Sequence, residues 1–344
     1  MPGMNGMKLA AAAPLICPGH SRPVAGIEFS RETDDGVFLI SACHDKTAMI
    51  RSGETGDWIG TFEGHKGAVW GAALNAPATR AATASGDFSA KVWDALTGDE
   101  LLELKHRHIV RACDWSADSV NLVTGGKEAK LRLFDLNQPD SEPQMLLGHE
   151  ANKAIKTIKY LPDPSGKLFL SAGDDKTLRL WDVRTLAETQ RLTFDGPVNS
   201  VELSRDNKTL TIAAGTEVSF WDALSYQCLK RFNLGVIEAN GYGVNSATLH
   251  PEQKAFVAGG GNFWVYVHDF ETGEELLCNK GHHGPVYGVR FTPDGKTYAS
   301  GGDDGTIRYW SFTEVAADAA ASEPAEGAAA EDGAAAAVDV GEAA

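Results

Sequence analysis

The segment GHHGPVYGVRFTPDGKTYASGGDDGTIRYW, residues 281–310, contains three short runs in which apolar residues alternate with other residues. The runs cover residues 286–291, 298–301 and 306–310, and the turns between them are Pro293-Asp294-Gly295 and Asp303-Asp304-Gly305. Alternation with a period of two indicates half-buried β-strands, and clusters of Gly, Pro and Asp indicate tight turns. The segment is therefore predicted to form three consecutive antiparallel strands.

Segments of the same kind recur along the chain at intervals of about 42 residues. They open at Gly19-His20, Gly64-His65, Lys105-His106, Gly148-His149 and Gly281-His282. They close at Arg51-Ser52, Trp93-Asp94, Phe134-Asp135, Trp181-Asp182, Trp221-Asp222, His268-Asp269 and Trp310-Ser311. No stretch shows a sustained helical period. Seven phased units with these ends are typical of WD40 repeats, so the chain is predicted to be an all-β, seven-bladed WD40 β-propeller.

The ring is predicted to close by joining the two ends of the chain. The last unit supplies three strands before the composition changes at Phe312, whereas Pro14–Cys17 resembles Ile59–Phe62, a fourth-strand position. We therefore expect residues 13–17 to be the outer strand of the last blade, so that no ring edge stays unpaired. The predicted organisation is a flexible N-terminus at residues 1–12, the propeller at 13–312 and an Ala-rich, acidic, disordered tail at 313–344.

The resemblance to WD40 blades implies a hydrogen-bonded chain of His, Ser or Thr, Asp and Trp inside a blade. Three units contain the whole set: His65, Thr83, Asp87 and Trp93; His149, Ser171, Asp175 and Trp181; and His282, Ser300, Asp304 and Trp310. A buried His needs an acceptor for its N–H, and the Asp supplies one. We therefore expect these histidines to be structural. The other units lack part of the set, with Glu128, Gly215 and Asn262 replacing the Asp in three of them, and we expect apolar packing to hold them.

Charge and cysteine content narrow the class of protein. The 344 residues carry 31 Lys and Arg against 47 Asp and Glu, a net charge of −16, and eight of the acids lie in the tail, which has no Lys or Arg. This balance argues against a general binder of nucleic acid or anionic membranes, and no apolar run is long enough to span a bilayer. The five cysteines are far apart and include no CxxC pair, so we expect a reduced compartment, the cytoplasm and nucleus.

Motifs for catalysis or cofactor binding are absent from the sequence. There is no P-loop, nucleophile elbow or HExxH, and Gly259-Gly260-Gly261 lacks the spacing of a dinucleotide-binding turn. His282-His283 and His106-Arg107-His108 suggest metal ligation, but a blade histidine and a basic loop explain them more simply. We expect no catalytic, cofactor-binding or metal-binding residues, no small-molecule substrate and no membrane partner. The chain is predicted to be a binding platform.

Four stretches are more specific than the general WD40 repeat pattern: TGDWIGTF at 55–62, GHKGAVWGA at 64–72, SAGDDKTLRLWD at 171–182 and NSATLHPE at 245–252. They resemble the serine/threonine kinase receptor-associated protein family, also called the Unr-interacting protein family. The resemblance covers residues 14–312. The Ala-rich N-terminus, an inserted loop at Gly235–Tyr242 and the composition of the tail depart from the family pattern.

This resemblance implies a non-catalytic scaffold. The family is associated with the survival-of-motor-neuron complex in assembly of spliceosomal small nuclear ribonucleoproteins, and it binds the cold-shock-domain protein Unr. It therefore implies protein partners, with any RNA contact made indirectly. Alternatives are the WD40 subunit i of eukaryotic translation initiation factor three, which residues 281–302 would also suit, and a signalling adaptor that binds receptor kinases. An enzyme whose site is assembled from loops without a motif is a further alternative.

The phase of the WD40 repeat predicts which residues face the narrow top surface. Those next to the first-strand valine and before the turn Asp are His44, Trp70, Arg111, Lys127, Lys156, Tyr287 and Asp303. Trp70 and Tyr287 are predicted aromatic anchors, and the cations form a basic sector that could meet acidic protein or RNA. Trp58, on an outer strand, is a second aromatic candidate. The alternative is that Trp70 packs against a neighbouring blade and the cations are only solvated.

Overall fold

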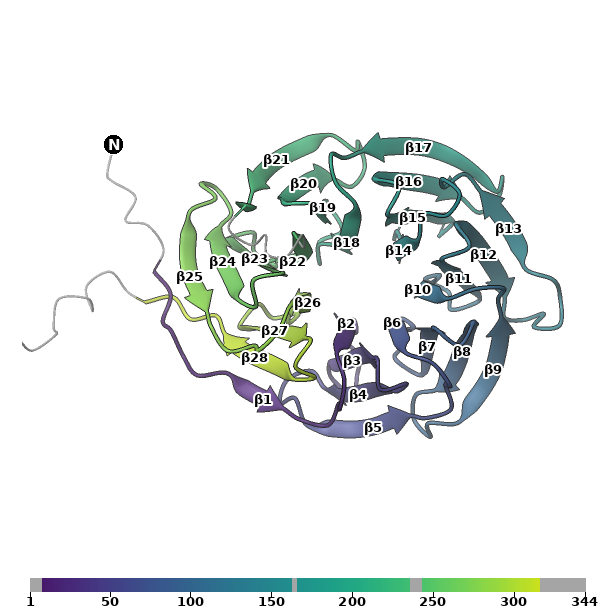
Figure 1. Ribbon diagram of the computed structural model, residues 1–344, viewed down its shortest axis with the longest axis horizontal. Helices are drawn as coiled ribbons and strands as arrows, with labels where there is room; N and C mark the ends of the chain where they lie inside the picture. The colour runs from purple at the N-terminus through teal and green to yellow at the C-terminus, as the bar shows by residue number, and fades with distance from the viewer. Residues whose placement is uncertain (1–7, 163–165, 236–242, 316–344) are drawn as a thin grey trace, which may run out of the picture.

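Seven four-stranded antiparallel sheets surround a central channel in the computed structural model, which describes residues 8–162, 166–235 and 243–315 (Figure 1). Each sheet is one blade, whose first strand lies at the channel and whose fourth strand lies at the outer rim. The prediction of an all-β, seven-bladed propeller is therefore confirmed. Within the described residues, no helix has the length and apolar character needed to cross a membrane.

The first four blades follow one another in the sequence. Blade 1 consists of β2 (Val24–Phe29), β3 (Phe38–Cys43), β4 (Ala48–Ser52) and β5 (Trp58–Phe62). Blade 2 consists of β6 (Val69–Leu74), β7 (Arg80–Ser85), β8 (Ser89–Asp94) and β9 (Glu100–Lys105). Blade 3 consists of β10 (Val110–Trp115), β11 (Asn121–Gly126), β12 (Lys130–Asp135) and β13 (Gln144–Leu147). Blade 4 consists of β14 (Ile155–Tyr160), β15 (Leu168–Gly173), β16 (Thr177–Asp182) and β17 (Ala187–Thr193).

The last three blades complete the ring. Blade 5 consists of β18 (Val198–Leu203), β19 (Thr209–Ala214), β20 (Glu217–Asp222) and β21 (Cys228–Asn233). Blade 6 consists of β22 (Val244–Leu249), β23 (Ala255–Gly260), β24 (Val265–Asp269) and β25 (Glu275–Asn279). Blade 7 consists of β26 (Val286–Phe291), β27 (Thr297–Gly302), β28 (Ile307–Ser311) and β1 (Leu15–Cys17).

Strand β1 closes the ring, as the sequence predicts. It runs antiparallel to β28, with Leu15 opposite Tyr309 and Cys17 opposite Ile307. Cys17 is buried in an apolar cluster that also contains Val24 of blade 1 and Tyr309 of blade 7. The closing strand therefore joins the first and last blades through both hydrogen bonds and apolar contacts.

Pairing between the two chain ends continues beyond β1. The Ala10 amide donates to the Thr313 carbonyl at 3.0 Å, and the Val315 amide donates to the Lys8 carbonyl at 2.8 Å. Residues 8–10 and 313–315 thus satisfy each other's backbone groups, a difference from the flexible segment expected up to residue 12. Residues 1–7 and 316–344 of the two predicted flexible segments lie outside the described residues, as do residues 236–242 of the inserted loop.

The hydrophobic core is a ring of clusters, each of which lies between neighbouring blades. Phe62 of β5 packs against Trp93 of β8 in the next blade, with ring centroids 5.7 Å apart, and both side chains are fully buried. Burial of a large apolar side chain contributes about 1.5–3 kcal/mol. Because every cluster draws on two blades, the blades stabilise one another and hold the channel-lining strands in fixed positions.

Hydrogen-bonded side chains inside the blades fix the turns between the second and third strands. In blade 4, His149 Nδ1 lies 2.7 Å from Asp175 Oδ2, and the Ser171 hydroxyl lies 2.7 Å from His149 Nε2. Trp181 Nε1 donates to Ser171 Oγ at 2.8 Å. The same chain links His65, Thr83, Asp87 and Trp93 in blade 2, and His282, Ser300, Asp304 and Trp310 in blade 7. Both ring nitrogens of these histidines are therefore occupied inside the blades.

Blade 1 contains most of such a chain, although we expected it to be held mainly by apolar packing. His20 Nδ1 lies 2.9 Å from Asp45 Oδ2, and His20 Nε2 lies 2.8 Å from Ser41 Oγ. The tryptophan position is taken by Arg51, which is buried and donates to the Gly56 carbonyl at 3.1 Å. The expectation is wrong for this blade, because loss of the Trp leaves the other three members able to bond.

Blade 3 also departs from the expectation of apolar packing. The Thr124 hydroxyl lies 2.7 Å from His106 Nε2, while His106 Nδ1 donates to the Leu104 carbonyl at 2.9 Å. Glu128, which replaces the turn Asp, forms an ion pair with Arg132 at 2.8 Å instead of contacting the histidine. Burial lowers the pKa of His106 to about 4, although the Leu104 carbonyl opposes this shift.

Acidification is therefore expected to destabilise the protein through His106. The unfolded chain takes up this proton below about pH 6.5, whereas folded His106 stays neutral to about pH 4, so the stabilisation present above pH 6.5 declines as the pH falls. From pH 7 to pH 5 this group alone should lower the free energy of unfolding by roughly 2 kcal/mol. Urea unfolding at the two pH values measures the change. In the His106→Gln variant, the loss of unfolding free energy between pH 7 and pH 5 should be smaller by this amount. An equal loss in variant and wild type would contradict the role given to His106.

Candidate partner-binding site

A β-bulge in the first strand of every blade aims one side chain into the channel. In blade 3, Val110 pairs with Gly126 and Ala112 with Gly125, so Arg111 is the extra, unpaired residue. The same register shift occurs in the other six blades. A bulge re-aims the side chain of its extra residue. The seven extra residues are Ala25, Trp70, Arg111, Lys156, Asn199, Asn245 and Tyr287.

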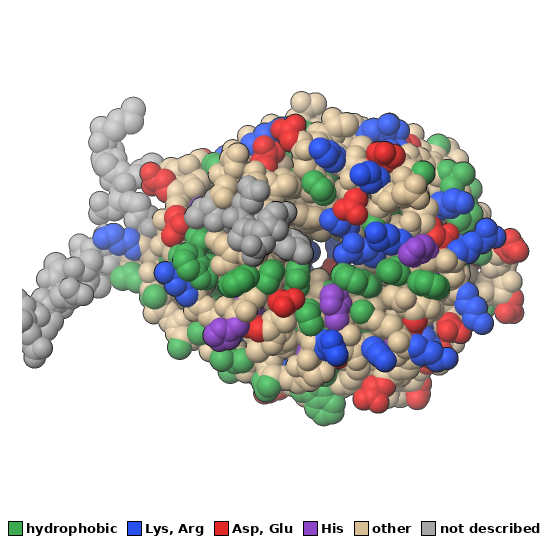
Figure 2. Space-filling view, in the orientation of Figure 1, with side chains coloured by type: hydrophobic (Ala, Val, Ile, Leu, Met, Phe, Trp, Pro, Cys, Tyr) green, Lys and Arg blue, Asp and Glu red, His purple; other side chains and the backbone are tan. Residues whose placement is uncertain are grey.

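These seven residues surround a cavity of about 540 Å³ at one mouth of the channel. The mouth lies on the top face, which we define as the face where the first strand of each blade begins. His44, Pro197, Gly215 and Gly243 complete the lining. In Figure 2, Lys and Arg side chains gather on one side of the central hollow, and a row of hydrophobic side chains lies next to them. The volume falls within the range of about 300–1,000 Å³ that is common for ligand sites.

Trp70 organises the basic side of the cavity. The Arg111 guanidinium lies over its indole ring, with Cζ 4.3 Å from the ring centroid. The His44 ring contacts the same indole edge to face, with centroids 4.2 Å apart. Burial lowers the pKa of His44, and the charge of Arg111 lowers it further. His44 is therefore neutral at pH 7 and acts as a packing partner of Trp70, whose flat ring holds the guanidinium in one orientation.

Blades 4 to 6 contribute polar side chains to the cavity that are already hydrogen-bonded or ion-paired. Lys156 Nζ lies 2.6 Å from Asp174 Oδ1 and 2.9 Å from Asn199 Oδ1. The Asn199 amide donates to the Val244 carbonyl at 2.9 Å, and the Asn245 amide donates to the Val286 carbonyl at 3.0 Å. The extra residues of blades 4, 5 and 6 thus each bond to the extra residue or the backbone of the next blade.

Paired charges cross the channel below this cavity. Lys159 of blade 4 forms an ion pair with Glu28 of blade 1 on the other side of the ring. Arg290 of blade 7 donates to Ser246 Oγ at 2.8 Å, and its Nε lies 3.8 Å from Glu202 Oε1 of blade 5. Lys159 and Arg290 follow Lys156 and Tyr287 by three residues, which places them about 10 Å deeper at the rise of a β-strand. A ligand that enters at the top therefore meets a floor of charges that already have partners.

Most of the residues predicted for the top surface meet at this cavity. His44, Trp70, Arg111, Lys156 and Tyr287 line it. Asp303 lies beside it, because the Tyr287 hydroxyl donates to Asp303 Oδ1 at 3.1 Å. Trp70 packs against His44 of blade 1 and Arg111 of blade 3, and it also lines the cavity, so both readings of this residue hold.

Two predicted residues lie elsewhere. Lys127 is exposed in the turn after β11 and is not part of the cavity lining. Trp58 lies on the outer strand β5, where it is 60% exposed and donates to Thr61 Oγ1 at 3.0 Å. The sequence reasoning also missed Asn199 and Asn245. Their signal was present, because they follow Val198 and Val244 as Trp70 follows Val69.

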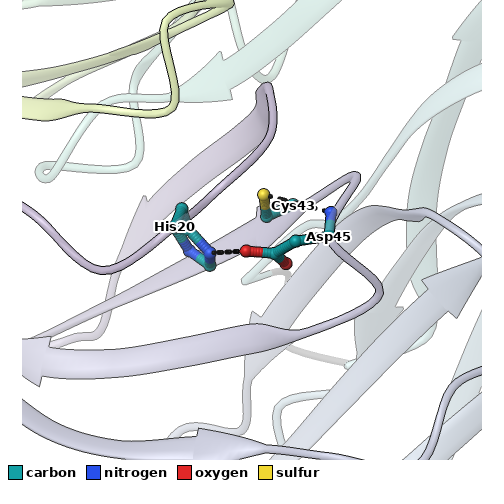
Figure 3. A group of neighbouring side chains, drawn as sticks. All are labelled: His20, Cys43 and Asp45. Atoms are coloured by element: carbon teal, nitrogen blue, oxygen red, sulfur yellow. Dashed lines mark hydrogen bonds and ion pairs between the residues drawn. The ribbon is translucent and has the colours of Figure 1, made fainter.

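One cluster of potential metal ligands occurs among the described residues, formed by His20, Cys43 and Asp45 (Figure 3). His20 already uses both ring nitrogens inside blade 1, and the Cys43 thiol donates to the Arg22 carbonyl at 3.0 Å. Burial raises the pKa of Cys43 to about 12, so the thiolate that a metal needs is strongly disfavoured.

Blade 2 contains the same arrangement with a serine in place of the cysteine. Ser85 Oγ donates to the Gly67 carbonyl at 3.1 Å and accepts the Asp87 amide at 3.2 Å, just as Cys43 Sγ accepts the Asp45 amide at 3.4 Å. The cluster of His20, Cys43 and Asp45 is therefore explained as a blade hydrogen-bond network.

Comparison with known proteins places this architecture in a family. Residues 273–311 match the model of the WD domain, G-beta repeat, and residues 71–221 match that of the nucleolar protein 10-like N-terminal domain. The human serine-threonine kinase receptor-associated protein is 50% identical over 86% of this chain and 82% of its own length, and the Dictyostelium discoideum protein of that name is 48% identical over 86% and 98%. Subunit I of eukaryotic translation initiation factor 3 from Culex quinquefasciatus is 29% identical over 87% and 96%.

The closed ring of WD40 blades, with a cavity lined by aromatic and basic residues, is that of a WD40 scaffold protein. WD40 propellers serve protein–protein interaction. Within that class, the identity of about one residue in two over the whole propeller is decisive. The chain belongs to the serine-threonine kinase receptor-associated protein family.

Proposed function

We propose that this protein is a non-catalytic adaptor that docks protein subunits of a ribonucleoprotein-assembly complex in the cytoplasm and nucleus. The observation that carries the docking role is the ring of seven bulged residues around an open cavity at the top of the propeller. The proposed partners are subunits of the survival-of-motor-neuron complex and an Unr-like cold-shock-domain protein. Family membership supports this choice.

RNA is proposed to be reached through these partners. Asp174 already pairs with Lys156 at 2.6 Å, and a second carboxylate, Asp303, lies beside Tyr287 at the cavity. A surface that binds RNA directly neutralises several successive phosphates with unpaired cations. All five cysteines are free thiols, which suits the proposed reducing compartments.

Affinity purification of the tagged full-length chain from cells tests the docking role. We expect survival-of-motor-neuron subunits and a cold-shock-domain protein to co-purify with the wild type, and the Trp70→Ala/Arg111→Glu variant to recover at most a tenth as much. A hot-spot aromatic and its stacked arginine typically account for several kcal/mol of binding. The variant with Trp58→Ala and Arg107→Glu makes the same two changes outside the cavity and should bind like the wild type.

Two results would contradict the proposal. Recovery of initiation-factor-three subunits in place of the proposed partners would show that the adaptor serves translation initiation. Loss of partners in the Trp58→Ala/Arg107→Glu variant, with retention in the cavity variant, would move docking to the outer rim.

Association with a receptor kinase is a second candidate. The names of the 50% identical relatives describe those proteins as receptor-associated. Probing the same eluates for serine/threonine kinase receptors tests this role.

A further inference from the structure

Arg111 differs from the other arginines that the structure describes. Its guanidinium is half-buried at the cavity wall and has no hydrogen bond or ion pair with a described residue. The other arginines without a polar partner for the guanidinium are exposed; they are Arg22, Arg31, Arg80 and Arg107. Buried or half-buried arginines elsewhere, such as Arg51, Arg179 and Arg308, have acceptors within the protein. Arg111 alone combines loss of water with a lack of acceptors in the described part of the chain.

Removing water from a cation without giving it a partner costs free energy. Burial accordingly lowers the pKa of Arg111, and the nearby carboxylate of Asp174 opposes that shift without bonding to the guanidinium. The guanidinium lies over the Trp70 ring, with Cζ 4.3 Å from the ring centroid, and Arg111 lines the cavity. A guanidinium held in this way is pre-organised for a planar anion with two oxygens, such as a carboxylate.

We propose that Arg111 anchors a carboxylate-binding site in the top cavity, which takes a Glu or Asp side chain from an extended segment of a partner protein. This inference rests on the docking role proposed above and adds the chemistry by which a partner is recognised. The indole of Trp70 and the phenol of Tyr287 flank the site and offer apolar contact to the residues beside the acid. Asn199 and Asn245 line the same cavity, and each side-chain NH2 has a second N–H besides the one bonded to a backbone carbonyl, which suits a peptide carbonyl.

The charges around the cavity favour one carboxylate over a polyanion. Lys156 is neutralised by Asp174 at 2.6 Å, and Asp303 lies beside Tyr287. Arg111 is therefore the cation of the lining that lacks a bonded acidic partner. A chain of phosphates would place further negative charges near Asp174 and Asp303, which repel them. A single acidic side chain brings one negative charge, which Arg111 can pair with.

The first experiment uses the full-length protein labelled with ¹⁵N and a small probe, N-acetylglutamate N-methylamide. We expect the probe to shift the resonances of the Arg111 Nε–H and the Trp70 indole N–H. These two resonances are assigned by their loss in the Arg111→Gln and Trp70→Phe variants. The matched glutamine amide, which has the same shape without the charge, should leave both resonances in place. Equal shifts with both probes, or no shift with either, would overturn the proposal.

The second experiment measures binding of fluorescein-labelled twelve-residue peptides with one central Glu and variable Gly, Ser, Leu and Tyr elsewhere. Arg111→Gln should weaken binding at least tenfold, and Arg111→Lys should fall between, because it keeps the charge and loses the two-pronged geometry. Arg107→Gln, on the same face and outside the cavity, should stay within twofold of the wild type. Equal affinity of Arg111→Gln and wild type would overturn the proposal, and thermal unfolding confirms that each variant is folded.

Two further binding measurements, with oligouridine and with phosphoserine peptides, test whether the site prefers another anion to a carboxylate. Oligouridine binding that depends on Arg111, with no effect of Arg111 on the acidic peptides, would assign the site to nucleic acid and overturn the proposal. Preference of more than tenfold for phosphoserine over Glu in the same peptides would overturn the carboxylate assignment. Because these measurements use purified protein, they can fail while ribonucleoprotein partners still co-purify, or succeed while those partners are absent. The two proposals are therefore tested separately.

Discussion

Deleting residues 1–17 is expected to lower the free energy of unfolding by on the order of 3–5 kcal/mol. The deletion removes strand β1, so β28 loses its partner and becomes an open edge. It also removes Cys17 from the apolar cluster between blades 7 and 1, and leaves a cavity beside Val24 and Tyr309. Urea unfolding, together with size-exclusion chromatography to detect association through the exposed edge, measures the effect.

A shorter deletion and a point change make this prediction specific. Removing residues 1–7 takes away none of the described pairings and should leave the unfolding midpoint unchanged. Ile16→Pro keeps the chain length but disrupts the short strand opposite Arg308, and should reproduce a large part of the loss. If the chain lacking residues 1–17 unfolds at the same urea concentration as the full chain, ring closure by β1 does not stabilise the propeller.

Asp175→Ala is expected to cost about 3–4 kcal/mol of stability. The carboxylate accepts hydrogen bonds from His149 at 2.7 Å and from the Thr177 hydroxyl at 2.9 Å, and Arg179 lies 3.4 Å away. The side chains of His149 and Asp175 are each 2% exposed, so no water replaces the lost acceptor. Chemical denaturation of wild type and variant at pH 7 measures the difference.

The neighbouring carboxylate provides the matched control. Asp174 is more exposed and pairs with Lys156, so Asp174→Ala should cost at most about 1 kcal/mol. Burial alone would raise the pKa of Asp175, but the hydrogen bonds from His149 and Thr177 outweigh it and hold the pKa well below its ordinary value. The stabilisation by the Asp175 carboxylate is therefore present above about pH 4 and is lost as the pH falls below it. In the Asp175→Ala variant, the free energy of unfolding should fall less steeply with pH in this acidic range. Equal effects of the two substitutions would contradict the role of the buried network.

The blade architecture was predictable because its information is local and repeated. Trp93, Trp181 and Trp310 recur at the same phase, and each carries its hydrogen-bond partners at a fixed distance along the chain. The assignment failed in blade 1, where Arg51 replaces the Trp and the sequence conceals that His20 and Asp45 still meet. A missing motif residue shows that one bond is lost, but it does not show whether the remaining partners stay in place.

The candidate site was predictable only in part. The rule that selects residues next to the first-strand valine found Trp70, Arg111, Lys156 and Tyr287, because one bulge recurs in every blade. The same rule applied to β18 and β22 would have found Asn199 and Asn245. Lys127 was selected by a second rule, as the residue before the turn position that Glu128 occupies, but it lies exposed on a turn outside the cavity.

The sequence by itself determined the ring, namely its number of blades and its closing strand, and it identified most of the side chains presented at the top, because each depends on short-range pattern and on repetition. Only the tertiary structure decided which of those side chains have partners. Lys156 and Arg111 carry the same charge at equivalent positions, yet Asp174 neutralises the lysine while Trp70 stacks on the arginine and provides no acceptor. The Lys156–Asp174 pair forms within blade 4, whereas the stack of Trp70 on Arg111 joins blades 2 and 3, so it depends on how the blades pack around the channel and no single repeat encodes it.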